Sequence, residues 1–409
     1  MMFAEKINHN NNFVLAVFIS YSMEKENKTE SLVSKINANV FFEEFTFCKN
    51  DFKALDSKQQ LEFADSVVWL DDLLFVYQIK ERQGSDNSFD VQKWYQNKVI
   101  NKGVKQIKST LAYLMEYPEI YIENQKGHKL NISQAKVCKS IRKIIIYSPN
   151  NEFSEKLRFV RFYESVTAGL IHLFHVEDYY WICKYLHTPA EVDEYLEFRE
   201  NYYLANPERS DLLPEQYILA HFFATLKTDH FEPEYINNFK KVNDEIEQFD
   251  ISRLIKNFTN GITLINHQTE YYPIIREISK LNRSELFEFK RRLFKSIEIC
   301  EDKEIVSPYR VHMPRTNCSF IFIPLHSSKS RHWRNALTNM VSAQKYMQKT
   351  EKCVGVTVFR EPDNPEYFQL FWMYMEGQWI YDSEMEALLK DNPPPFRETH
   401  IKKVDNRYL

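Results

Sequence analysis

The largely apolar stretch between Glu62 and Arg82 contains three polar residues that could act together, two as ligands of a metal ion and the third as a cation beside it. They are Asp65, Gln78 and Lys80. Two apolar runs flank Asp71-Asp72, and aspartate tolerates the positive φ that a tight turn requires. The stretch therefore predicts a β-hairpin in which Leu70 faces Leu73 and Asp65 faces Gln78.

Alternation along the two strands places Asp65, Gln78 and Lys80 on one side of the predicted sheet. The opposite side is apolar and needs a cover of helices. Directly opposed residues have Cβ atoms about 5 Å apart, so a carboxylate oxygen and an amide oxygen can share a hard cation such as Mg²⁺. An ammonium two residues along the strand would then steady a phosphate charge or orient a water molecule.

This arrangement resembles the PD-(D/E)xK nuclease superfamily, whose signature is an Asp opening the second strand, a hairpin, then an acidic residue, any residue, and Lys. Asp65 matches the Asp, and Lys80 matches the Lys. Gln78 stands where an acid is usual, which is similar to the variant in Mrr-type restriction nucleases. The family also has an acid on the preceding helix, where Glu43 and Glu44 stand, and Glu44 is the favoured match.

The resemblance implies a restriction-endonuclease-like fold, with the order α-β-β-α-β over residues 30 to 150. It implies a metal-dependent endonuclease that hydrolyses phosphodiester bonds, with DNA favoured over RNA and with Mg²⁺ or Mn²⁺ as the cofactor. Asp65, Gln78 and Glu44 would hold the metal with the Ile79 carbonyl, and Lys80 would position the attacking water. A role in bacterial defence against foreign DNA follows from the resemblance alone, with a homo-oligomer or a defence-system protein as the partner.

Two other interpretations stay open. An ordinary apolar hairpin whose outer face happens to carry Asp, Gln and Lys would give the same pattern. A catalytically inactive nuclease-fold module for nucleic-acid binding or protein assembly is the competing function, and Gln78 favours it because it removes a charge from the metal site.

Two groups of basic residues are candidate nucleic-acid contacts. Asp90 to Met115 predicts a helix, on which Lys98, Lys102 and Lys105 lie on a different face from the apolar stripe. They form either a ridge that follows phosphates or a solvated face. Arg331 and Arg334 flank Trp333 between a predicted strand and a predicted helix, where nucleic-acid contact and plain surface charge are both open.

Composition limits the remaining classes of function. The chain has 409 residues and a net charge of −4, so any nucleic-acid site must be local. Its seven glycines are never clustered, which excludes P-loop and Rossmann phosphate loops. Its six cysteines include no CxxC pair, which excludes a zinc ribbon and indicates reduced thiols in a cytoplasmic protein.

The length and the pattern of elements predict an α/β protein with three parts. A mixed sheet flanked by helices spans residues 1–205, which the resemblance implies to be the nuclease domain. A helical connector spans 206–260, and a small α/β domain, expected to serve recognition or interaction, spans 261–409. The apolar run from Phe13 to Ser20 is interpreted as a buried strand rather than a signal peptide, and no membrane contact is expected. His172 and His175 fit a strand that points them to opposite faces, which disfavours a metal site there.

Overall fold

A computed structural model of the 409-residue chain divides into two compact units, which are described separately. The hairpin unit comprises residues 22–245, and the C-terminal unit comprises residues 246–407 together with 1–21. The described residues are 2–8, 28–53, 60–83, 88–149, 153–239, 241–242, 248, 250–251, 254–255, 267–302, 307–361 and 364–397.

An eight-stranded mixed sheet forms the centre of the hairpin unit, in the order β10-β11-β9-β6-β5-β2-β7-β8. The strands β6, β9 and β11 run parallel to one another, and the other neighbours are antiparallel. A separate two-stranded ribbon pairs β3 with β4. The strand bounds are β2 Thr46–Lys49, β3 Asp51–Lys53, β4 Gln60–Glu62, β5 Ser66–Leu70, β6 Leu73–Glu81, β7 Tyr121–Asn124, β8 Lys129–Asn131, β9 Ser140–Ser148, β10 Phe162–Ser165 and β11 Gly169–His175.

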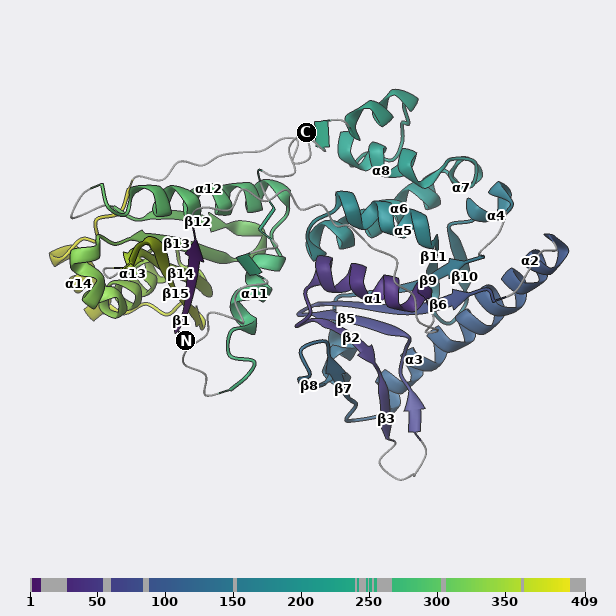
Figure 1. Ribbon diagram of the computed structural model, residues 1–409, viewed down its shortest axis with the longest axis horizontal. Coiled ribbons are helices and arrows are strands. Elements are labelled where there is room, and N and C mark those ends of the chain that lie inside the picture. The colour runs from purple at the N-terminus through teal and green to yellow at the C-terminus, as the bar shows by residue number, and fades with distance from the viewer. Residues whose placement is uncertain are drawn as a thin grey trace. The chain divides into compact units, whose positions relative to one another are not determined.

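Helices cover both faces of this sheet (Figure 1). Alternate residues of β6 serve the two cores: Phe75, Tyr77 and Ile79 face one, while Leu74 and Val76 face the other. The first core is covered by α1 Lys28–Phe41, α5 Val176–Tyr185, α6 Pro189–Ala205 and α8 Glu215–Ala224. The second is covered by a continuous helix of three parts, α2 Ser88–Trp94, the π-helical η1 Tyr95–Gly103 and α3 Val104–Glu116.

Gly103 allows the helix η1 to approach strand β9 closely, and a few short helices complete the hairpin unit. A Cβ on Gly103 would lie 2.9 Å from Ile145 Cδ1, so glycine lets the helix pack directly on β9. The shorter helices are η2 Ile132–Val137, α4 Glu155–Arg158, α7 Pro207–Ser210 and η3 Pro233–Asn237.

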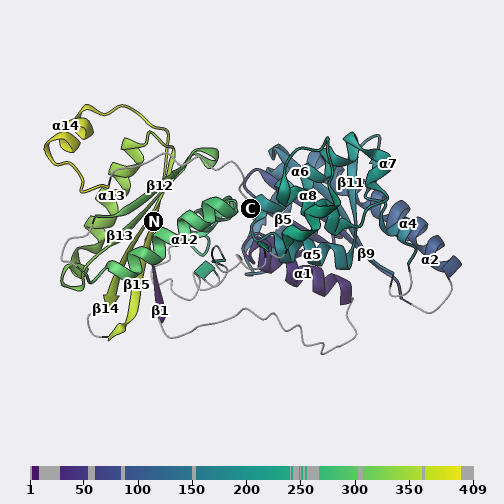
Figure 2. The ribbon, with the colours of Figure 1, turned by 90° about the horizontal axis from the view of Figure 1, so that it is seen from above.

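The C-terminal unit is built on a five-stranded sheet in the order β1-β15-β14-β13-β12. One face carries α12, whose Phe289 contacts Phe320 and Phe322, and the other face carries α13 (Figure 2). The strands are β1 Met2–Asn8, β12 Tyr309–Met313, β13 Cys318–Pro324, β14 Lys352–Glu361 and β15 Asn364–Glu376, and the helices are α11 Tyr272–Ser279, α12 Arg283–Ile299, η4 Pro314–Thr316, η5 Ser327–His332, α13 Trp333–Met347 and α14 Ser383–Asp391.

The α/β class is confirmed, but the chain divides differently from the three predicted parts. Strand β1 pairs with β15, so residues 1–21 group with the C-terminal unit instead of the predicted 1–205 domain. The predicted connector 206–260 is not separate, because Ile218, Phe222 and Phe223 belong to the core under α1. The strand predicted at 13–20 lies outside the described residues. In the described part of the chain, no helix has the length and apolarity to cross a membrane.

Candidate active site

The predicted hairpin forms with the predicted register. Strands β5 and β6 pair so that Leu70 faces Leu73 and Ser66 faces Tyr77. Asp71 opens the turn with a φ of 53°, the left-handed conformation that aspartate tolerates better than most residues. Asp65 directly precedes β5, which places it next to Gln78 at the far end of the hairpin from the turn.

Three oxygens converge on the Lys80 ammonium at that end of the hairpin. Lys80 Nζ lies 2.9 Å from Asp65 Oδ2, 3.1 Å from Gln78 Oε1 and 3.0 Å from the carbonyl oxygen of Ile79. The backbone N–H of Ile79 donates to Asp65 Oδ2 as well. The Asp65 and Lys80 side chains are each 11% exposed, so the group is sheltered and still open to solvent on one side.

These oxygens are a suitable partial ligand set for a hard divalent cation. Mg²⁺ prefers oxygen ligands at about 2.1 Å, and the ammonium already marks a point where one carboxylate, one amide and one carbonyl oxygen meet. A metal would bind there if the ammonium moved aside and the oxygens closed in by less than about 1 Å. In the described part of the chain, no group of three His, Cys, Asp or Glu side chains is arranged around a common point. Water or a phosphate oxygen would therefore have to complete the coordination.

Glu62 is a further carboxylate close to Asp65 and Lys80, and it is not among the candidate site residues predicted from the sequence. Burial raises the pKa of Glu62, and the negative charges of Asp65 and Asp51 raise it further, whereas Lys80 and Lys102 lower it. Asp51 raises the pKa of Glu62 because the two residues face each other in the β3–β4 pair. The spacing of Glu62 three residues before Asp65 was the available signal in the sequence.

Glu44 does not belong to this site, so its predicted metal-binding and catalytic role is wrong. Strand β2 pairs with β5 so that Thr46 faces Val68, and the Trp69 N–H donates to the Phe45 carbonyl. Glu44 therefore lies beside the turn end of β5, about 16 Å along the strand from Asp65. Its buried carboxylate lies 3.9 Å from Lys126 Nζ.

The predicted lysine ridge lies on the helix that covers the face of the sheet to which Gln78 and Lys80 belong. Lys98 and Lys102 are exposed on η1, and Lys105 is exposed on α3. None of the three forms an ion pair with any residue that the structure describes. Lys102 is close enough to Glu62 to lower its pKa, which connects the ridge to the Asp65 end of the hairpin.

We expect this ridge to carry a measurable part of nucleic-acid binding. Replacing Lys98, Lys102 and Lys105 by Gln should reduce the slope of log affinity against log salt by about 0.9 for each phosphate that the variant no longer neutralises. Fluorescence anisotropy with labelled DNA, in an Asp65→Asn background that prevents cleavage, measures this slope.

The control for this experiment removes the same charge from other exposed lysines of the hairpin unit. Lys129, Lys136 and Lys156 are exposed and have no ion pair with any described residue. Their triple Gln variant should keep the wild-type slope. Equal slopes for both triple variants would mean that the ridge is only a solvated face.

Arg331 and Arg334 belong to the C-terminal unit, whereas the hairpin site belongs to the other unit, and each unit is described by itself. Both are exposed at the junction of η5 and α13. Trp333 stacks on Phe371 with a centroid distance of 3.8 Å, and the Arg334 guanidinium lies 5.1 Å from the Trp333 ring centroid. Because Phe371 contacts the Trp333 ring, this tryptophan serves the core, and base stacking on that side is excluded.

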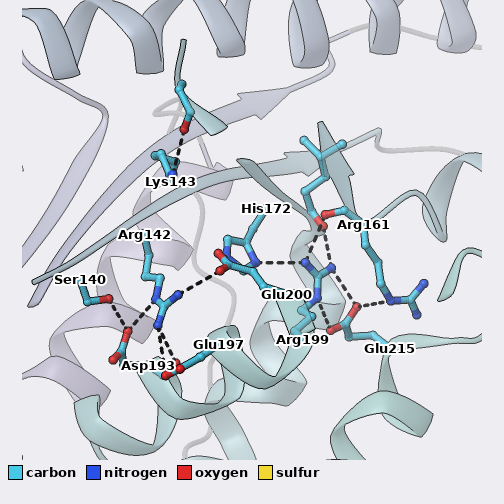
Figure 3. Close-up of polar contacts among 12 residues, drawn as sticks. Ser140, Arg142, Lys143, Arg161, His172, Asp193, Glu197, Arg199, Glu200 and Glu215 are labelled. Carbon is cyan, nitrogen blue, oxygen red and sulfur yellow. Dashed lines mark hydrogen bonds and ion pairs between the residues drawn. The ribbon is translucent and has the colours of Figure 1, made fainter. Parts of the chain in front are cut away.

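His172 and His175 point to opposite faces of β11, as predicted, and His172 belongs to a buried polar network (Figure 3). Arg199 NH1 lies 3.2 Å from His172 Nδ1, and His172 Nε2 lies 2.9 Å from Glu200 Oε1. Arginine only donates, so Nδ1 accepts and Nε2 carries the proton that is donated to Glu200. The imidazole is therefore neutral.

Glu215 is the central anion of the same network. Its carboxylate accepts from Arg199 Nε at 2.7 Å and Arg199 NH2 at 3.0 Å, and the Tyr195 hydroxyl also donates to it. Burial alone would raise the pKa of Glu215, but the two guanidinium groups of Arg199 and Arg161 lower it to about 2. This cluster is buried and ties α6 and α8 to the sheet, so we assign it a structural role.

The network predicts loss of stability in mild acid. Burial lowers the pKa of His172 to about 4, from 6.5 in the unfolded chain. The neutral imidazole therefore contributes fully to the free energy of unfolding above pH 6.5, and this contribution is lost as the pH falls toward 4. The loss amounts to about 2 kcal/mol between pH 7 and pH 5. Glu215 acts in the same direction below pH 4.5. Urea unfolding at pH 7 and pH 5 measures the loss.

His172→Gln should be less stable at pH 7 but lose less of its remaining stability on going to pH 5. His230→Gln is the control, because the His230 side chain is 71% exposed in the same unit. An unchanged pH dependence in His172→Gln would contradict the assignment of the titrating group.

Comparisons with known proteins found no relative of this chain. No protein-family model matches the chain, and neither a curated protein nor a solved structure matches it.

Proposed function

We propose that the hairpin unit is a metal-dependent nuclease that hydrolyses phosphodiester bonds, with DNA favoured over RNA. The observation that carries the proposal is the convergence of Asp65, Gln78 and the Ile79 carbonyl on the cation at Lys80 Nζ. The superfamily resemblance assigns these same oxygens to the metal. A role in defence against foreign DNA, with a partner protein or a second copy, remains a proposal from the resemblance.

In this proposal the chain's own groups have separate tasks. Asp65, Gln78 and the Ile79 carbonyl would hold Mg²⁺ or Mn²⁺, and the metal would supply Lewis acidity to the phosphate and to a water molecule. Lys80, displaced from the oxygens, donates to the attacking water or to the phosphate oxygens. Glu62 replaces Glu44 as the additional acid, because it shares its surroundings with Asp65.

Phosphates would be held by the ammonium groups of the ridge. Lys102 is the member that lies near both the carboxylates and the exposed helix face. Because the ridge lysines form no ion pair with a described carboxylate, they give a phosphodiester backbone a path to the site at little desolvation cost. Since the contacts go to phosphates, the proposal predicts weak dependence on base sequence.

A cleavage assay tests the proposal directly. Plasmid, linear duplex, single-stranded DNA and RNA are incubated with the full chain in Mg²⁺, in Mn²⁺ and in EDTA. Cleavage that needs a divalent cation supports the proposal. If no substrate is cut and no Mn²⁺ binds to the wild-type chain, the catalytic proposal fails.

Gln78→Glu separates the metal role of this side chain from a structural role. The change restores the residue usual in the superfamily and adds a negative charge next to Asp65. We expect Mn²⁺ affinity to rise about tenfold or more with cleavage retained, whereas Gln78→Ala loses an oxygen ligand and most activity. Calorimetric titration with Mn²⁺ measures the affinity, and a fall in affinity for Gln78→Glu would contradict the proposal.

The second candidate is an inactive nuclease-fold module, and one observation favours it. The Lys80 ammonium fills the point where a metal would bind, and Gln78 contributes no charge to compete for it. In that case the chain binds DNA through the ridge with the same affinity in Mg²⁺ and in EDTA.

A further inference from the structure

A pocket of about 710 Å³ lies in the C-terminal unit, far in sequence from the hairpin site. It is bounded by the end of α13, by α14 and by the segment 393–397. The two helices lie on the same side of the sheet in Figures 1 and 2. The volume is in the range of small-molecule sites, which is about 300–1,000 Å³.

The lining of this pocket is strongly basic, although the whole chain carries a net charge of −4. Four cationic side chains line it, and the single carboxylate among its lining residues is Glu386, which lies 3.3 Å from the Tyr346 hydroxyl. None of the four cations forms an ion pair with a residue that the structure describes. They are Arg310, Lys349, Lys390 and Arg397.

Three of these cations make cation–π contacts with aromatic rings and have no carboxylate partner among the described residues. The Arg310 guanidinium lies 4.7 Å from the Phe396 ring centroid, and Lys349 Nζ lies 5.1 Å from the Trp379 ring centroid. The Arg397 guanidinium lies 3.9 Å from the Tyr309 ring centroid. A cation–π contact orients a cation without neutralising it. Each nitrogen of Arg310 and the Nε atom of Arg397 already donate to protein oxygens. The donors left for an anion are therefore mainly Lys349 Nζ and the two terminal nitrogens of Arg397.

Backbone carbonyls fix the positions of the Trp379 ring and the Arg310 guanidinium. Trp379 Nε1 donates to the Tyr346 carbonyl at 3.0 Å, and Arg310 donates twice to the Arg397 carbonyl, at 2.9 and 3.2 Å. Binding an anion would therefore require little ordering of side chains, which favours affinity. Lys390, which has no ion pair in the described part of the chain, is an exposed donor on α14.

The geometry points to a binding site for a small molecule that carries a chain of two or more phosphate groups. Several cations without carboxylate partners around one pocket match several negative charges, and the two terminal nitrogens of the Arg397 guanidinium can bind phosphate oxygens as a pair. One face of the Trp379 and Phe396 rings is covered by a cation, so phosphate recognition, not base stacking, provides most of the contacts. The shared chemistry fits both inorganic polyphosphate and a nucleoside polyphosphate.

Calorimetric titration of the full chain, without divalent metal, tests this inference with two probes, inorganic triphosphate and ATP. We expect both probes to bind. Equal affinity identifies the phosphate chain as the ligand, and tighter binding of ATP identifies a nucleotide. Lys349→Gln and Arg397→Gln should each weaken binding about tenfold or more.

A matched control distinguishes the pocket from general surface charge. Lys184 is exposed, and its Nζ lies 4.5 Å from the Trp181 ring centroid in the hairpin unit, so it repeats the Lys349 contact outside the pocket. Lys184→Gln should bind both probes like the wild type. The inference is overturned if neither probe binds at millimolar concentration, or if Lys349→Gln and Lys184→Gln bind equally well. Cleavage by the hairpin unit is not measured, so the outcome is independent of the proposed nuclease activity.

Discussion

Asp65→Asn and Lys80→Ala are each expected to lower the cleavage rate at least about a hundredfold. Asp65→Asn keeps an oxygen that accepts from the Ile79 N–H but removes the charge that a metal needs. Lys80→Ala removes the ammonium that lies against all three oxygens. Initial rates on a DNA substrate in Mg²⁺, with thermal unfolding measured on the same preparations, test both variants.

The hairpin offers its own control for this prediction. Asp72 is a half-exposed aspartate in the turn, and it pairs with the exposed Lys139. Asp72→Asn should cleave at the wild-type rate. Wild-type cleavage by Asp65→Asn would show that the activity comes from another site or from a contaminant, and the binding-module interpretation would then replace the catalytic one.

A comparison of two glutamates tests where the additional acid lies. Glu62→Gln should lower the rate, because Glu62 shares its electrostatic surroundings with Asp65 and Lys80. Glu44→Gln should leave the rate nearly unchanged, because Glu44 lies at the other end of β5. The reverse result would contradict the register-based placement of the proposed metal site.

Removing the central anion of the buried network is expected to have the largest effect on stability. Glu215→Leu should lower the free energy of unfolding by about 3–5 kcal/mol, because it leaves buried guanidinium groups without their counter-charge. Arg199 and Arg161 are 1% and 2% exposed, so water cannot replace the missing carboxylate. Urea unfolding at pH 7 measures the change.

Removal of both partners should cost less than the sum of the single changes. In Arg199→Met/Glu215→Leu the main uncompensated charge is gone, so a positive coupling of more than about 1 kcal/mol is expected. Lys139→Ala breaks an exposed ion pair and should cost less than about 1 kcal/mol. A loss for Glu215→Leu as small as that of Lys139→Ala would refute the assigned role.

The hairpin was predictable from the sequence because every force that shapes it is local. Period-two alternation sets which side chains share a face, and Asp71 supplies the positive φ of the turn. The register of β5 on β6 follows from that turn, so Asp65, Gln78 and Lys80 meet as predicted. The same local reasoning separates the buried stripe of the α3 helix from its lysines.

Contacts between distant segments required the tertiary structure. The position of Glu44 depends on how β2 pairs with β5, which neither turn chemistry nor periodicity specifies. The pairing of β1 with β15 likewise joins residues separated by most of the chain. Long-range pairing is chosen by the total burial of both sheets, and no single segment encodes it.

The buried charged residues could not be predicted from the sequence either. Arg199 and Glu215 look like ordinary surface residues of two helices, since arginine and glutamate are rarely buried unless paired. Only the packing of α6 and α8 on the sheet brings them together with His172. The sequence by itself determined the hairpin and which side chains share the face of Asp65, Gln78 and Lys80. The tertiary structure decided which distant charges meet, because the low dielectric of a core makes burial favourable only when every partner is in place.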